Sequence, residues 1–132
     1  MKDSLDPQDW WEAAMRDRRV ARIVYQEDPD DLASNVCTNC QQACEKMLKA
    51  YLLTRGWPLE RTHDLRALVE EGRKSLPELD QVAPRLTELS ADFLPSRYPT
   101  ESEWGFAATD AAEAVELMDS LTNLLRPHIA KQ

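Results

Sequence analysis

Apolar residues recur at spacings of three and four along most of the chain, and no alternating pattern persists over five residues. These spacings are those of amphipathic helices. The first such segment runs from about Pro7 to Gln26, and the carboxylate of Asp6 is suited to cap its free amides. Its predicted inner stripe consists of Trp10, Ala13, Ala14, Asp17, Val20, Ala21 and Val24.

A second and longer helix is predicted to start at a cap formed by Asp30 or Asp31 and to end near Gly56, a residue type common just past helix ends. Its wide apolar surface indicates the central helix of a bundle. We assign three of its side chains to the polar face and place Lys46 at the edge; the three are Gln42, Glu45 and Lys49.

Three further helical segments follow. A short one covers about 62–71 and is closed by Gly72, and another covers 76–93 with Ser75 as its cap. Pro84 lies inside the latter, which predicts a kink or break near Val82 because proline removes a helical hydrogen bond. The last helix starts near Thr109 or Asp110 and is expected to end or bend at Pro127.

These elements predict an all-α protein, an antiparallel up-down helical bundle of four main helices plus one short helix. The 132 residues form a single domain, 1–132, and a chain of this size typically buries about two thirds of its unfolded surface. No apolar run approaches the roughly 20 residues of a membrane span. The amino-terminal residues also lack the apolar core of a signal peptide. We therefore expect a cytoplasmic protein with no membrane association.

The net charge is −8, with a pI near 4.7. This charge argues against general nucleic-acid binding and against DNA, because sequence-independent affinity comes mainly from Lys and Arg. Five basic residues remain as a possible local cleft, or alternatively as solvated charges at helix ends: Arg55, Arg61, Arg66, Arg73 and Lys74.

Cys37, Cys40 and Cys44 share one face of the second helix. Three thiolates on one straight helix cannot surround a zinc ion, so we expect core packing and no metal site. An odd number of cysteines fits a reducing compartment.

Four short motifs, in this order, carry a family resemblance. They are Trp10-x3-Ala14-x2-Asp17-x3-Ala21, Gln41-Gln42-Ala43-x-Glu45-Lys46-x-Leu48-Lys49-Ala50, His63-Asp64-Leu65-x2-Leu68 and Ser96-Arg97-Tyr98-Pro99. With them the chain resembles HEPN domains, named for higher eukaryotes and prokaryotes nucleotide-binding. The resemblance implies a homodimeric accessory domain without a cofactor. It also implies a minimal nucleotidyltransferase as partner, in a toxin–antitoxin pair or a two-part nucleotide-transfer system.

Active HEPN families are metal-independent ribonucleases in which an Arg is followed, after four to six residues, by a His. Arg97 fits the first position, but the chain has Ser102, Glu103 and Trp104 where the His would stand. Losing an acid–base group typically costs about 10²–10⁴ in rate, so the resemblance favours binding over catalysis. The alternative is a ribonuclease in which Glu103 or His63 replaces the missing group.

The resemblance implies a binding site for a nucleotide or RNA, in which Arg97 holds a phosphate and Tyr98 or Trp104 stacks on a base. Asp17 stands within an apolar stripe, so its carboxylate needs either a partner, Lys46 or Arg97, or access to water at the stripe edge. His63 is either a hydrogen-bonded residue at a helix end or a proton-transfer group. A purely structural dimerisation module remains a further alternative.

Overall fold

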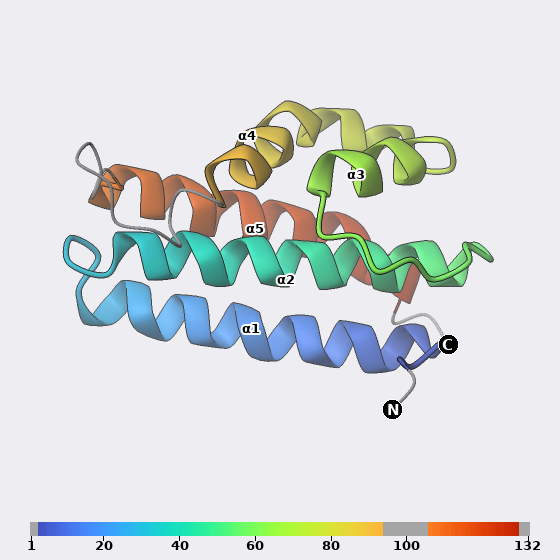
Figure 1. Ribbon diagram of the computed structural model, residues 1–132, viewed down its shortest axis with the longest axis horizontal. Helices are drawn as coiled ribbons and strands as arrows, with labels where there is room; N and C mark the ends of the chain where they lie inside the picture. The colour runs from blue at the N-terminus through green and yellow to red at the C-terminus, as the bar shows by residue number, and fades with distance from the viewer. Residues whose placement is uncertain (1–2, 94–105, 130–132) are drawn as a thin grey trace.

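The computed structural model describes residues 3–93 and 106–129, and within them every regular element is helical. The elements are α1 (Pro7–Glu27), α2 (Ala33–Thr54), α3 (Leu65–Arg73), a 3₁₀ turn η1 (Pro77–Gln81), α4 (Ala83–Phe93) and α5 (Ala108–Ile129). The predicted all-helical bundle is thereby confirmed (Figure 1). No helix in the described ranges is long and apolar enough to cross a membrane.

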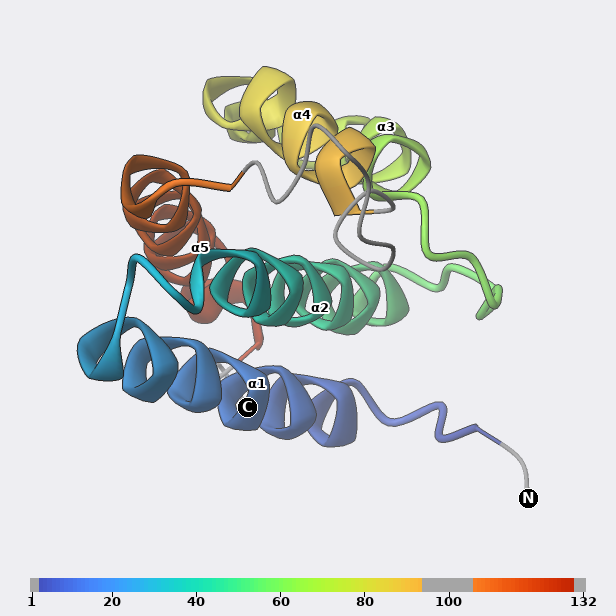
Figure 2. The ribbon, with the colours of Figure 1, turned by 60° about the vertical axis from the view of Figure 1, so that its left-hand side comes forward.

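Helix α2 lies at the centre of the bundle (Figures 1 and 2). Helices α1 and α5 pack along it, while α3 and α4 cover its other side. Helix α1 runs opposite to α2, whereas α5 runs in the same direction as α2. The linker of residues 55–64 returns along α2 before α3 begins, so it covers part of the central helix.

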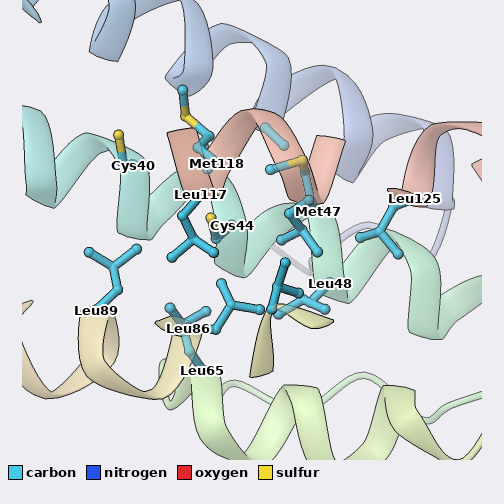
Figure 3. Close-up of a cluster of buried hydrophobic side chains, with 14 of the residues drawn as sticks. Cys40, Cys44, Met47, Leu48, Leu65, Leu86, Leu89, Leu117, Met118 and Leu125 are labelled. Carbon is cyan, nitrogen blue, oxygen red and sulfur yellow. The ribbon is translucent and has the colours of Figure 1, made fainter. Parts of the chain in front are cut away.

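The core includes apolar side chains from all five α-helices, and Figure 3 shows the part that α2 shares with α3, α4 and α5. Cys40 and Cys44 lie within it, beside Leu117 and Met118. Burial raises the pKa of both thiols far above the ordinary value, so they remain protonated and pack as small apolar groups. No group of His, Cys, Asp and Glu that could hold a metal ion occurs in the described part of the chain.

Two helix ends follow the prediction and one does not. The Asp6 carboxylate accepts from the amide of Gln8 at 2.9 Å, and Gly56 has a φ of +84° just past α2. The expected cap of α2 is wrong, because the N-cap is Leu32 and has no side-chain hydrogen bond. Asp31 instead donates its own amide to the carboxylate of Asp28 at 3.1 Å.

The segment between α3 and α4 breaks where proline predicts it. The 3₁₀ turn η1 ends at Gln81, and α4 starts at Ala83, directly before Pro84. Gly72 does not close α3 but lies inside it, where an added Cβ would stand 2.8 Å from Leu79 Cδ1. The expected cap by Ser75 is also wrong, because its hydroxyl pairs with the Tyr51 hydroxyl at 2.8 Å.

Helix α1 differs from the prediction in two details. Trp11 rather than Trp10 is buried, and Val20 is 45% exposed. The reason is an ionic contact with α5, in which Arg18 Nε and Arg22 Nη2 bind the two Asp119 oxygens at 3.0 and 2.9 Å. Helix α5 does not end at Pro127 but continues to Ile129, and a bend at Pro127 stays a prediction.

Candidate functional site

Two charged side chains that the sequence assigns to the polar face of α2 are in fact buried. Glu45 is 6% exposed and Lys49 is 3% exposed. They lie one turn apart on α2, and Lys49 Nζ is 3.0 Å from Glu45 Oε2. Burying a carboxylate or an ammonium is costly unless each has a partner, so the pair accounts for how both charges are held inside.

The same carboxylate oxygen also contacts a histidine from the linker. His63 Nδ1 lies 2.9 Å from Glu45 Oε2, and the His63 side chain is nevertheless 74% exposed. Gln41 Nε2 donates to Glu45 Oε1 and to the His63 carbonyl oxygen, both at 3.4 Å. We call these four residues, Gln41, Glu45, Lys49 and His63, the Glu45 cluster.

The backbone around His63 is fixed by the start of α3. Asp64 caps this helix by accepting from the amide of Arg66 at 3.0 Å. The amide of Leu65 donates to Ser90 Oγ on α4 at 3.2 Å. His63 therefore stands at the end of a linker that is anchored to α2, α3 and α4.

The contact with Glu45 determines which ring nitrogen of His63 is available. A carboxylate accepts, so Nδ1 carries the proton in this contact. Nε2 is on the opposite edge of the ring and faces away from the buried carboxylate. A neutral His63 therefore presents a proton acceptor at Nε2, and a protonated His63 presents a donor.

A second ion pair occupies the neighbouring part of α2. Lys46 Nζ is 2.7 Å from Asp17 Oδ2 on α1, and the two side chains are 33% and 23% exposed. Lys46 is thus the partner that the carboxylate within the α1 stripe requires. Because both groups are partly exposed, this pair contributes about 1 kcal/mol or less to stability.

The remaining predicted site residues, Arg97, Tyr98 and Trp104, lie outside the described residues, as does Glu103. Their roles therefore stay predictions. The structure pairs Asp17 with Lys46 and His63 with Glu45. Lys46 and Glu45 are neighbours on α2, so the two contacts lie at the same level of that helix.

The basic residues considered as a local cleft mostly face acidic neighbours. Arg61 pairs with Asp3, Lys74 pairs with Glu71, and Arg73 pairs with both Glu70 and Asp80. This pairing supports the alternative that they are solvated charges at helix ends.

The sequence pattern does not single out Gln41, Glu45 and Lys49 as a connected group. Their spacing of four was a usable signal, since it places them in one row on a helix that is buried on most sides. Lys49 also lies 5.3 Å from the centre of the Trp10 ring on α1, which closes the cluster on that side.

The bundle packs around a largely apolar central helix that carries a buried polar group, and comparison with known proteins identifies its class. The chain matches the HEPN domain family over residues 7–128, and it therefore belongs to that family. It is similar in structure to ST0689, an archaeal HEPN homologue, with a TM-score of 0.74 and 25% identity over 98% of this chain and 99% of that one.

The fold is also that of TT1696 from Thermus thermophilus, with a TM-score of 0.75 and 23% identity over 92% of this chain and 97% of that one. No curated protein matches the sequence.

Proposed function

We propose that this HEPN domain binds a phosphate group of a nucleotide or of RNA, without a metal ion, at the Glu45 cluster. The observation that carries the proposal is the anchoring of an exposed histidine by a buried carboxylate. A surface histidine needs no buried carboxylate for stability. The arrangement is, however, typical of groups that must hold one orientation toward a ligand.

In this proposal His63 donates to the phosphate, and Arg97 grips it with its planar guanidinium. Tyr98 or Trp104 stacks on the base. The Asp17–Lys46 pair orders the adjacent surface between α1 and α2, where it would also hold Arg97 in place.

The proposal includes a partner. Membership of the HEPN family supports a homodimer that acts as the accessory domain of a minimal nucleotidyltransferase, in a toxin–antitoxin or nucleotide-transfer pair. Light scattering of the purified chain, alone and with such a partner, tests this part. A monomer that forms no complex would contradict it.

A second candidate function is metal-independent RNA cleavage. It is favoured by the geometry of His63, whose Nε2 faces away from Glu45 as a proton-transfer group requires. Here Arg97 stabilises the phosphate charge, and His63 or Glu103 takes the place of the histidine missing from positions 102–104.

The experiment that separates these functions uses a mixed-sequence RNA with a chelator, incubated with the wild-type protein and with Arg97→Ala. Binding without cleavage supports the first function, and cleavage that is lost in Arg97→Ala supports the second. If RNA and nucleoside monophosphates both fail to bind at millimolar concentration, the chain is a structural module instead. A large fall in the melting temperature of Arg97→Ala would make Arg97 a structural residue.

A further inference from the structure

We infer that Glu45 is the positioning residue of the phosphate site: it fixes the Nδ1–H tautomer of His63 and directs Nε2 toward the bound phosphate. This inference rests on the proposed function and adds the device that orients its ligand. The ligand class is a phosphate ester anion, which a nucleotide or an RNA strand can supply.

The Glu45 cluster is unfavourable to bury. Gln41 Nε2 is held by Glu45 and by the His63 carbonyl oxygen, and Gln41 Oε1 is buried with no hydrogen-bond partner among the described residues. An unsatisfied buried acceptor is unfavourable, and a buried ion pair is often no more stable than apolar residues of similar size. Stability alone therefore does not account for this group of side chains.

Helix α3 begins two residues after His63. A helix amino-terminus can bind phosphate through free amides, but three of the first four amides of α3 have partners. The amide of Leu65 donates to Ser90 Oγ, that of Arg66 to the Asp64 carboxylate, and that of Leu68 to the Asp64 carbonyl oxygen. The side chains of His63, Asp64 and Arg66 are exposed at this point, and His63 is the one that Glu45 orients.

The charges of the Glu45 cluster are compatible with a bound anion at His63. Glu45 and Lys49 neutralise each other inside the protein. Protonation of His63 then adds one positive charge at the surface, and a phosphate anion at Nε2 compensates it. Glu45 thus supports both states of the ring: it accepts from Nδ1 when His63 is neutral and pairs with it when His63 is charged.

The test reads the ring nitrogens of both histidines by nitrogen-15 NMR in the full chain. His128 is the internal control, because it is exposed but packs edge-on against Tyr51, 5.6 Å between ring centres. We expect His63 to be the Nδ1–H tautomer when neutral. Addition of inorganic phosphate, of a nucleoside monophosphate or of a single-stranded RNA should shift its Nε2 and leave His128 unchanged.

Glu45→Gln should abolish the tautomer preference and weaken phosphate binding about five- to tenfold, the effect of one lost oriented hydrogen bond. Because this variant leaves Lys49 buried without a charged partner, the double variant Glu45→Gln/Lys49→Met is measured beside it. Met removes the second charge and suits contact with Trp10. The double variant should fold and show the same loss of tautomer preference and affinity.

The outcomes separate the inference from the function on which it rests. If the wild type binds phosphate through His63 but both variants keep its tautomer and affinity, the inference is wrong and the proposed function stands. If no phosphate compound shifts His63, the proposed function fails, and the inference fails with it. A response to the monophosphate alone identifies a nucleotide site, and a response to RNA alone identifies an RNA site.

Discussion

His63 Nδ1 and Glu45 Oε2 are 2.9 Å apart although 18 residues separate them along the chain. One residue is buried in the central helix and the other is exposed at the end of a linker. The contact therefore connects the interior of the bundle with the surface at which a ligand would bind. It also gives the linker of residues 55–64 a fixed position over α2 (Figure 1).

Lys49→Met is predicted to destabilise the fold strongly, because it leaves the buried carboxylate of Glu45 without its cationic partner on α2. Removing one member of a buried pair typically costs about 3–5 kcal/mol. Urea unfolding followed by circular dichroism measures the change. Glu45→Gln/Lys49→Met is the matched control and should recover most of the loss. Equal stability of Lys49→Met and the wild type would mean that the Glu45 carboxylate has other compensation.

Gly56→Ala is predicted to destabilise by about 1 kcal/mol, because Gly56 has a φ of +84°, a conformation unfavourable for residues with a Cβ. An added Cβ would meet no atom within 4 Å, so steric contact does not contribute. Gly56→Asn serves as the control, since Asn tolerates this conformation better. A thermal melt in which both variants match the wild type would show that the end of α2 can relax.

The buried thiols give a prediction about pH. Burial raises the pKa of Cys40 and Cys44 in the folded protein. In the unfolded chain a thiol ionises near pH 8.5. Below that pH both thiols are protonated in the folded and in the unfolded state, so they do not lower the free energy of unfolding. The free energy of unfolding falls as the pH rises above the ionisation of the unfolded thiols, because only the unfolded state releases these protons.

We accordingly expect the free energy of unfolding to fall above about pH 9. We also expect Cys40 and Cys44 to react with iodoacetamide at pH 8 only after denaturation. Mass spectrometry of the labelled protein, native and denatured, measures both sites. Rapid alkylation of native Cys44 would contradict the account.

The parts of the fold that local chemistry determines could be predicted from the sequence. The Asp6 cap, the end of α2 at Gly56 and the break before Pro84 depend on a few neighbouring residues, and all three are confirmed. Which face α1 turns toward the bundle could not be predicted. It depends on the contacts of Arg18 and Arg22 with Asp119, which lies about 100 residues away on α5.

The site shows the same division. A charge within an apolar stripe is readily recognised, so the sequence predicts that Asp17 needs a partner. Lys46 is one of the two candidates, and the structure pairs it with Asp17. Helical periodicity assigns Glu45 and Lys49 to a polar face. They are buried instead, because the returning linker and Trp10 cover them. Helical periodicity alone contains no information about which segment covers a helix.

The most direct test of the central claim is the affinity of His63→Asn for a labelled single-stranded RNA and for a nucleoside monophosphate, measured by fluorescence anisotropy and calorimetry. His128→Asn is the matched control, since both histidines are exposed and only His63 is oriented by a buried carboxylate. We predict a loss of roughly ten- to a hundredfold for His63→Asn, the effect of one charged hydrogen bond, and wild-type binding for His128→Asn. Equal affinity of His63→Asn and the wild type would contradict a phosphate site at the Glu45 cluster.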